Sequence, residues 1–296
     1  MKKKLKRMIN PKKIIVFLAK KNIIKISDKF FIKMVYKEKF SKNIDLKNPK
    51  TFNEKLQWLK LYDRNPEYSQ MVDKYQVKEY VAQIIGKVHI IPTLGLYKSF
   101  EEIDFEKLPN EFVIKCTHDS GSTIVCKDKN KFDISEAKKK INKSLKSNYY
   151  YLGREWPYKN VIPQILIEKY IFDDKIEELR DYKIFCFNGK VKFFKIDYDR
   201  FINHKANYYD KKLKIMEFGE EVCPPDPNKE IIIPKDIYKM FDFAEMLAKN
   251  LKFARIDFYY TNEHIYFGEI TFYPASGFGK FIPEKWDKKI GEMLKI

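Results

Sequence analysis

Residues 254–259 read ARIDFY and residues 267–271 read FGEIT, and together they are the most informative part of the chain. Polar and apolar side chains largely alternate along both segments, as they do in half-buried β-strands. If the segments form an antiparallel hairpin whose loop is centred on Glu263, Asp257 lies opposite Glu269 on one face of the sheet. The hairpin therefore predicts two facing carboxylates.

The same register pairs Arg255 with Thr271 and Tyr259 with Phe267 on the face of the carboxylates. Facing carboxylates repel each other unless a cation lies between them. Carboxylate oxygens suit Mg²⁺, and a neighbouring arginine can hold a phosphate oxygen in a bidentate grip. The alternative is an Arg–Asp–Glu ion cluster on a solvated sheet face.

Helix signals dominate roughly the first 86 residues. Ser27 is placed to cap one helix, Thr51 and Glu54 form a capping box for another, and Gly86 is placed to end a third. The apolar face of the first helix is expected to contain Phe30, Phe31, Met34 and Val35.

Strand signals follow. A strand and turn are expected at 88–97, and strands are expected at 112–116, 123–126 and 164–171. Asn188-Gly189 is a strong hairpin turn between 180–187 and 190–197. A helical stripe spans 237–251, before the hairpin of 253–273. Hairpins without regular βαβ alternation indicate an α+β fold.

A small polar loop follows the strand that carries Lys115. Its residues Ser120, Gly121 and Ser122 offer hydroxyl and backbone N–H groups to a phosphate, and the lysine adds a point charge. The spacing is not that of a Walker A loop. An ordinary hairpin turn is the alternative.

The strand at 164–171 is apolar at its start and polar near its end. Its residues Glu168, Lys169, Tyr170 and Ile171 could present backbone groups to the edge of an adenine. Taken alone, the segment is equally a buried strand.

The net charge of +18 is concentrated at the N-terminus, because residues 1–50 carry 17 basic and 3 acidic side chains. The hydrophobic content of 44% excludes a disordered protein, and the nearly neutral remainder excludes a uniformly basic nucleic-acid binder. Residues 1–25 hold ten basic groups and no acid among apolar residues, which suits an anionic membrane surface or a polyanion. A solvated tail is the alternative. The four cysteines lack zinc spacing and indicate a reducing cytoplasm.

Several runs resemble the ATP-grasp superfamily, and more closely its teichuronopeptide-biosynthesis (TupA-like) branch. These runs are NPKTFNEKLQW at 48–58, VDKY at 72–75, FVIKCTH at 112–118, RDYK at 180–183 and FGEITFYP at 267–274. The resemblance extends from about residue 30 to the C-terminus. It implies an ATP-grasp fold, in which two α+β lobes clasp ATP, behind a helical and basic N-terminal extension.

The divisions that this resemblance implies are an extension at 1–47, a helical pre-grasp region at 48–110, an N-terminal lobe at 111–170 and a C-terminal lobe at 171–296. Lys115 would contact the α- and β-phosphates, Ser120 to Ser122 would form the lid, and Glu168, Lys169, Tyr170 and Ile171 would form the adenine hinge. Asp257 and Glu269 would hold Mg²⁺, with Thr271 where the superfamily usually has Asn. Arg255 would stabilise developing phosphate charge and Lys183 would reach the γ-phosphate. The acid that would bind the ribose is not singled out; the candidates are Asp173, Asp174, Glu177 and Glu178.

The implied activity is formation of an amide through an acylphosphate, with ATP and Mg²⁺ as requirements. The expected substrates are a uronic acid of a capsular or other cell-surface polysaccharide precursor and an amine or amino acid. The expected location is cytoplasmic and peripheral on the inner face of the cell membrane, with no nucleic-acid partner.

Two other functions remain open. One is a glycosyltransferase that uses a nucleotide sugar, since Asp197-Tyr198-Asp199 is a DxD motif. The other is a non-catalytic protein that binds polyanions or a membrane surface.

Overall fold

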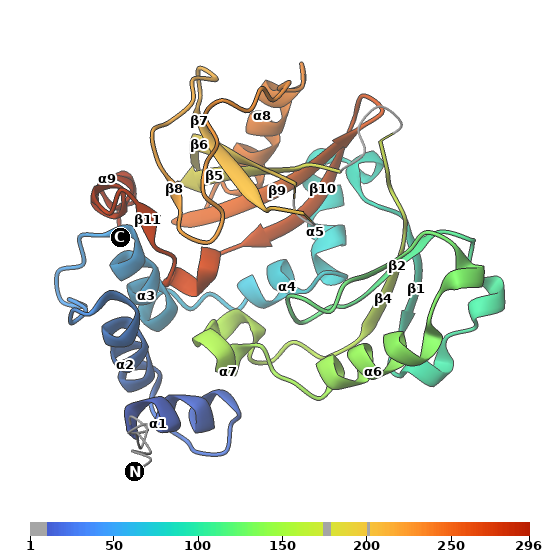
Figure 1. Cartoon of the computed structure of the whole chain (residues 1–296), viewed down its shortest axis with the longest axis horizontal. Coiled ribbons are helices and arrows are strands. Elements are labelled where there is room, and N and C mark those ends of the chain that lie inside the picture. Colours follow the sequence, from blue (N-terminus) through green and yellow to red (C-terminus); the bar gives the residue numbers. More distant parts are fainter. Residues whose placement is uncertain (1–10, 174–178, 200–201) are drawn as a thin grey trace, which may run out of the picture.

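The computed structural model describes residues 11–173, 179–199 and 202–296. Two antiparallel β-sheets lie in different halves of the molecule, and helices pack beside them (Figure 1). A short pair, β8 (Gly219–Glu220) with β11 (Phe281–Ile282), forms a third sheet. This arrangement confirms the α+β class.

The smaller sheet has the strand order β1–β4–β2–β3. Its strands are Thr93–Tyr97 (β1), Ile165–Lys169 (β4), Phe112–Cys116 (β2) and Ile124–Cys126 (β3). Helix α6 (Ile134–Leu145) packs against it through Ala137 and Ile141. The strand predicted at 164–171 ends at Lys169, so Tyr170 and Ile171 follow the strand.

Strand β1 lies within the predicted strand and turn at 88–97, which confirms that prediction. It pairs with β4, with Gly95 opposite Ile167. The limits of the four divisions stay predictions.

The larger sheet has the strand order β10–β9–β5–β6–β7. Its strands are His264–Thr271 (β10), Phe253–Thr261 (β9), Asp181–Phe187 (β5), Lys190–Tyr198 (β6) and Lys205–Asp210 (β7). Asn188 and Gly189 both have positive φ angles, as a two-residue hairpin turn requires, so the predicted β5–β6 hairpin is confirmed. Helix α8 (Ile237–Leu247) packs against one face, and the opposite face carries charged side chains.

The predicted register of the last hairpin is right near its end and wrong near its turn. Asp257 pairs with Glu269 and Arg255 with Thr271, as expected, but Phe267 pairs with Phe258. A bulge between Phe267 and Glu269 causes the change. The extra residue in β10 puts the side chains before the bulge on the opposite face of the sheet from the one expected. Phe267 therefore lies in the core at 4% exposure. Tyr259, predicted to face Phe267, pairs with Tyr266.

Within the described residues, five α-helices precede the first strand. They are α1 (Pro11–Lys20), α2 (Asp28–Phe40), α3 (Phe52–Tyr62), α4 (Tyr68–Val72) and α5 (Gln76–Ile85). The Ser27 cap, the Thr51–Glu54 capping box and the end of α5 at Gly86 are confirmed. Phe30 is 50% exposed, so its predicted place on the buried face of α2 is wrong. The buried face of α2 contains Phe31, Ile32, Val35 and Tyr36.

The remaining helical elements are short or C-terminal. They are α7 (Tyr150–Gly153), α9 (Lys285–Met293), and the 3₁₀ turns η1 (Lys87–His89), η2 (Phe100–Glu102), η3 (Phe105–Lys107), η4 (Lys129–Lys131), η5 (Trp156–Tyr158) and η6 (Pro274–Gly277). Helix α9 packs against α3. Among the described residues, no helix is both long and apolar enough to span a membrane. All four cysteines are buried free thiols.

Candidate active site

Arg255 lies at the centre of the charged face of the larger sheet. Its Nε donates to Asp257 Oδ1 at 2.7 Å, and its Nη2 donates to Asp257 Oδ2 at 2.7 Å. The same Nη2 lies 2.9 Å from Glu269 Oε1 and 3.0 Å from Thr271 Oγ1. All four side chains are brought together because they alternate along the paired strands β9 and β10.

Lys183 joins this group from the neighbouring strand β5. Its Nζ lies 2.7 Å from Asp257 Oδ2, 3.4 Å from Asp181 and 3.7 Å from Asp197. Burial tends to raise the pKa of Asp257, but Arg255 and Lys183 outweigh it and hold that pKa below its usual value. Asp257 is therefore an ionised carboxylate, and Arg255 supplies the positive charge that separates it from Glu269.

A second ion cluster surrounds Lys195 on β6. The ligand atoms of Asp197, His204 and Cys223 lie within 4.8 Å of one another, close enough to share a metal ion. The Lys195 ammonium already lies 3.2 Å from Asp197, 3.0 Å from Glu220 and 3.8 Å from Cys223 Sγ. Burial raises the pKa of Cys223 to about 12, and a protonated thiol is a poor metal ligand. Lys195 thus provides the cation of this cluster.

The two carboxylates of the DxD motif have different cations beside them. Asp197 is 3% exposed and lies between Lys195 and Lys183. Asp199 lies 3.7 Å from Lys229 and has a positive φ of 52°. These separate ion pairs do not favour a metal shared between the two carboxylates.

Lys115 is fixed by an ion pair within the smaller sheet. It pairs with Glu168 on the adjacent strand β4, and Lys78 of α5 reaches the same carboxylate at 2.5 Å. Burial tends to raise the pKa of Glu168, yet the two lysines hold it below its usual value. The Glu168 side chain thus positions Lys115, a role that the resemblance does not assign to it.

The loop from Thr117 to Thr123 is braced from inside. Ser122 Oγ accepts from the Cys116 amide at 2.8 Å and donates to Asp119 Oδ1 at 2.6 Å. Asp119 also accepts from Ser144 on α6. The Ser122 hydroxyl is therefore engaged within the loop, contrary to its expected availability for phosphate.

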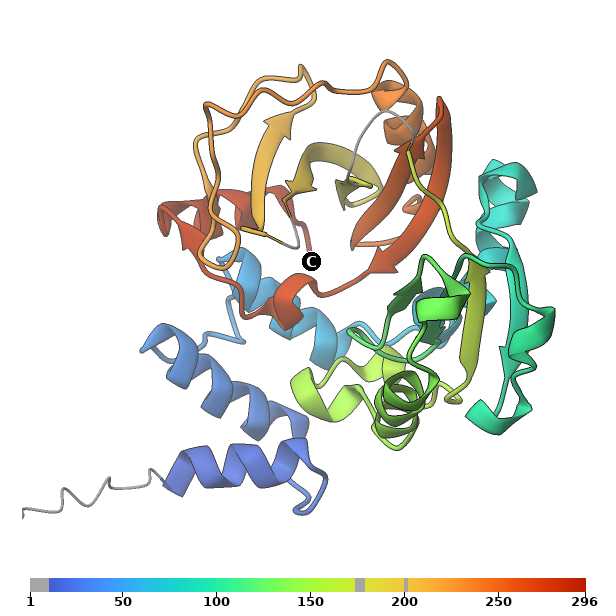
Figure 2. The same ribbon diagram turned by 45° about the vertical axis from the view of Figure 1, so that its right-hand side comes forward.

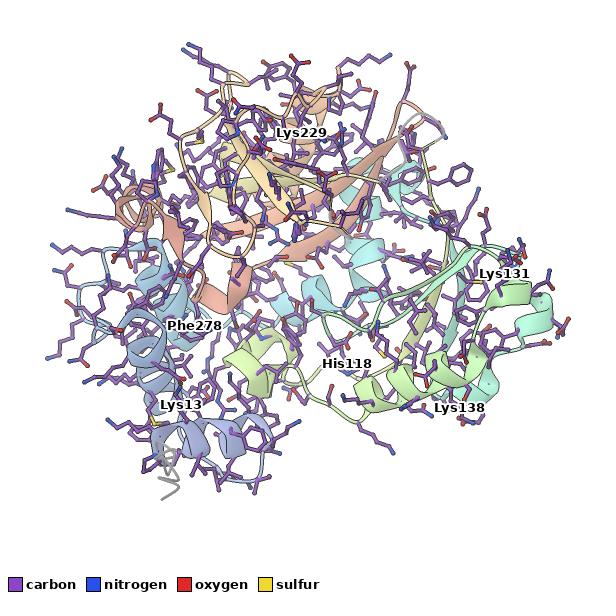
Figure 3. The ribbon with its side chains drawn as sticks, viewed as in Figure 1. Lys13, His118, Lys131, Lys138, Lys229 and Phe278 are labelled. Carbon is purple, nitrogen blue, oxygen red and sulfur yellow. The ribbon has the colours of Figure 1, made fainter. Side chains whose placement is uncertain are left out.

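The tip of this loop lies at the surface. Ser120 and Gly121 are exposed, and Gly121 has a φ of 102° with open space around it, a conformation that favours glycine. His118 lies beside α6 (Figure 3), where Nε2 is 3.2 Å from the carbonyl oxygens of both Ser144 and Ser147. That contact gives His118 a capping role at the end of α6.

The predicted hinge follows directly from β4. The Lys169 amide donates to the Pro92 carbonyl at 3.0 Å, and the ring of Tyr170 stacks on Phe172 at 5.9 Å. Thr261 of β9 donates to the Phe172 carbonyl, which connects this segment to the larger sheet. Contact of Lys169, Tyr170 and Ile171 with adenine stays a prediction. Three of the four ribose candidates, Asp174, Glu177 and Glu178, lie outside the described residues.

Lys74 binds the loop of the smaller sheet, and the sequence reasoning gave it no role. It donates to the Asp119 carbonyl, and its own amide donates to the Thr117 carbonyl at 3.0 Å. Burial lowers the pKa of Lys74, while the negative charges of Glu269 and Asp119 oppose that shift. Because Glu269 acts on this lysine, the carboxylates of the larger sheet lie near the loop of the smaller one. The run VDKY at 72–75 was the signal that could have identified Lys74.

A buried lysine holds the segment that follows β10. Lys60 Nζ donates to the carbonyls of Gly153 at 2.7 Å and Ser276 at 2.6 Å. Ser276 Oγ donates to Glu155 at 2.6 Å. The pKa of Glu155 is raised above its usual value, mainly by burial. The negative charge of Glu269 raises it further, and the positive charge of Arg255 opposes the shift. Lys60, Glu155 and Ser276 therefore border the Arg255 cluster, and sequence reasoning missed all three.

The charged face is suited to a divalent cation. Five carboxylates (Asp181, Asp197, Asp257, Glu220, Glu269) meet three cations (Lys183, Lys195, Arg255). Glu269 is the most accessible of these acids, with 45% of its side chain exposed. Its contacts with Arg255 and Thr271 both use Oε1, and Oε2 has no partner among the described residues. Such oxygen donors fit Mg²⁺.

One protein-family model matches most of the chain. The TupA-like ATP-grasp model matches residues 54–295, a range that includes both sheets and the Arg255 cluster. The chain therefore belongs to the TupA-like ATP-grasp family. This confirms the resemblance seen in the sequence runs.

The solved structures similar to this chain include ATP-grasp ligases. They include D-alanine–D-alanine ligase of Bacillus anthracis with ATP (17% identity, 68% of this chain, 54% of that chain, TM-score 0.39) and the Helicobacter pylori enzyme (14%, 82%, 69%, 0.40). An ADP complex of N5-carboxyaminoimidazole ribonucleotide synthetase has 15% identity, with 74% of this chain and 50% of that chain covered and a TM-score of 0.40. These distant likenesses add nothing to the family assignment. No curated protein matches the chain.

Proposed function

We propose that this chain is an ATP- and Mg²⁺-dependent ligase that joins a carboxylate to an amine. The observation that carries the proposal is the Arg255–Asp257–Glu269 cluster, which lies near Lys74 and the loop at 117–123. Cations from both halves and accessible carboxylate oxygens are what a metal–triphosphate needs. The proposed carboxylate substrate is a uronic acid of a capsular or other cell-surface polysaccharide precursor.

The reaction proceeds in two steps. A substrate carboxylate oxygen attacks the γ-phosphorus of ATP, and the bond between that phosphorus and the β–γ bridging oxygen breaks. The products of this step are an acylphosphate and ADP. An amine then attacks the acyl carbon, phosphate leaves with the bonding electrons, and the amine loses a proton as the amide forms. Such phosphoryl transfer depends mainly on positioning and charge neutralisation.

The residues divide this work by their positions. Lys115, held by Glu168, would bind the α- and β-phosphates. Arg255 and Lys183 would neutralise charge on the transferred phosphoryl group. Glu269, Asp257 and Thr271 would hold Mg²⁺, which neutralises phosphate charge when bound. Ser120 and Gly121 would cover the phosphates from the loop tip.

A trapping assay tests this proposal. The purified full chain is incubated with MgATP, hydroxylamine and candidate uronic acids, and both ADP and hydroxamate are measured. The proposal predicts equal amounts of the two, only when ATP, Mg²⁺ and a uronic acid are all present. Release of UDP from a UDP-sugar without ATP would instead establish the glycosyltransferase. ADP formation without hydroxamate from any carboxylate would contradict an acylphosphate intermediate.

A further inference from the structure

Helices α1 and α2 and the turn between them present large apolar side chains to solvent. Ile14, Phe17, Ile23 and Phe30 are 42%, 57%, 65% and 50% exposed. Single exposed apolar residues are ordinary, but here four lie within residues 14–30. We call these four side chains, with the lysines around them, the α1–α2 face; Figure 2 shows both helices at the edge of the molecule.

The α1–α2 face is strongly basic. Residues 11–40 contain nine lysines, at positions 12, 13, 20, 21, 25, 29, 33, 37 and 39, against Asp28 and Glu38. Glu38 pairs with Lys13 at 3.5 Å, and Asp28 pairs with Arg64 of the body at 2.7 Å. The two acids therefore leave most of the lysine charge without a neutralising carboxylate from this segment.

The face is part of the folded body. The guanidinium of Arg154 lies 4.5 Å from the ring centroid of Phe31, and Asp28 accepts from Arg64 and from Tyr150 of α7. Helix α1 packs against α7 as well. The solvated-tail alternative, which concerned residues 1–25, is therefore wrong for residues 11–25, whereas residues 1–10 lie outside the described part. The exposed apolar groups are held outward by a rigid base.

We propose that the α1–α2 face docks on an anionic lipid bilayer. Apolar side chains that project from a helix among lysines are the signature of a segment lying in the membrane interface, and each lysine near the surface adds attraction to acidic headgroups. A nucleic acid would engage the lysines but leave the four apolar groups in water. A second copy of the chain would bring like charges together. The inference is independent of the proposed ligase activity.

Docking of the α1–α2 face would bring the bilayer to the side of the molecule where α7 leads toward the Arg255 cluster. Helix α7 contacts α1 and is followed by Glu155, which accepts from Ser276 Oγ at 2.6 Å in the segment after β10. A bilayer on the α1–α2 face therefore approaches the side of the molecule that carries α7 (Figure 1). If the proposed function holds, an acceptor carried on a membrane lipid is the class of substrate that this placement suits.

Vesicle co-sedimentation tests the inference with the full chain. The vesicles contain phosphatidylcholine alone or phosphatidylcholine mixed with phosphatidylglycerol. The test variant is Ile14→Ser/Phe17→Ser/Phe30→Ser, and the matched control is Ile162→Ser/Val222→Ser/Ile232→Ser, whose sites are 70%, 78% and 86% exposed elsewhere. Thermal unfolding checks that both variants fold, as exposed sites should allow.

The unmodified chain should bind the phosphatidylglycerol vesicles and leave the neutral ones largely unbound. The test variant should lose about tenfold or more in affinity, by the transfer of three apolar groups, and the control should lose none. Weaker binding of the unmodified chain at high salt would support electrostatic attraction between the lysines and the acidic headgroups. Equal binding by test and control variants, or no binding by the unmodified chain, would overturn the proposal.

Discussion

Arg255 is the residue that changes the interpretation of the carboxylate pair. The sequence pattern placed two facing acids on one sheet face and offered either a metal ion or an ion cluster to separate them. The structure places the Arg255 guanidinium within 2.9 Å of both carboxylates. The two interpretations are compatible, because Glu269 keeps one oxygen and much of its surface accessible.

Lys60 predicts a pH dependence of stability. Burial lowers its pKa from 10.5 to about 7 in the folded protein. Between these values the unfolded chain binds the proton and the folded chain does not, so the free energy of unfolding should rise with pH. The rise is at most about 1.4 kcal/mol per pH unit.

The measurement compares the unmodified chain with Lys60→Met by urea unfolding between about pH 8 and pH 10. The free energy of unfolding of the unmodified chain should increase relative to that of Lys60→Met across this range. Parallel pH profiles would show that Lys60 does not carry the depressed pKa.

At the scale of elements, helix α3 holds the segment that follows strand β10. Gln57 Nε2 donates to the carbonyls of Ser276 at 3.1 Å and Gly277 at 2.6 Å. Asn53 Nδ2 donates to the Gly279 carbonyl at 2.8 Å. These residues belong to the run at 48–58, so the family-specific sequence there serves to clamp residues 276–279.

We expect Gln57→Leu to destabilise the protein by about 1–3 kcal/mol, because it removes the Gln57 donor from the buried Gly277 carbonyl. The Ser276 carbonyl still accepts from Lys60. It should also reduce ADP formation, since the clamped segment follows Glu269 and Thr271. Gln83→Leu on the exposed side of α5 is the control and should change stability by less than about 0.5 kcal/mol. Equal losses of stability and activity in both variants would contradict the role of Gln57 in holding residues 276–279.

Most elements could be predicted from local patterns. The Thr51–Glu54 capping box, the end of α5 at Gly86 and the Asn188-Gly189 turn all depend on short-range chemistry. The bulge before Glu269 could not be predicted, because the sequence does not mark where an antiparallel pair gains an extra residue. It reversed the faces of Phe267 and its neighbours while leaving Asp257 opposite Glu269.

The candidate site was only partly accessible to sequence reasoning. Arg255, Asp257, Glu269 and Thr271 share a hairpin, so their spacing predicts their contact. Lys60, Lys74 and Glu155 reach the same region from distant parts of the chain, and only tertiary packing brings them there. The engagement of Ser122 inside its loop likewise depends on Asp119 and Cys116.

At the scale of the whole molecule, a nucleotide that bridges both sheets should stabilise the chain. With Mg²⁺ and a non-hydrolysable ATP analogue at about 100 times its Kd, the free energy of unfolding should rise by about 2.7 kcal/mol. Thermal unfolding would then shift upward by several degrees. A UDP-sugar should have no such effect, and stabilisation by the UDP-sugar in place of the ATP analogue would contradict nucleotide binding of the proposed kind.

The central claim is that the Arg255 cluster holds the metal for ATP turnover, and Glu269→Gln tests it most directly. Asp257→Asn is a poorer test, because Asp257 is 2% exposed and its carboxylate is the nearest acidic partner of both Arg255 and Lys183. Glu263→Gln, in the exposed turn of the same hairpin, is the matched control. We expect Glu269→Gln to reduce Mg²⁺-dependent ADP formation by about 100-fold or more, with an unchanged unfolding midpoint and full activity in Glu263→Gln. Full ADP formation by folded Glu269→Gln would contradict the account.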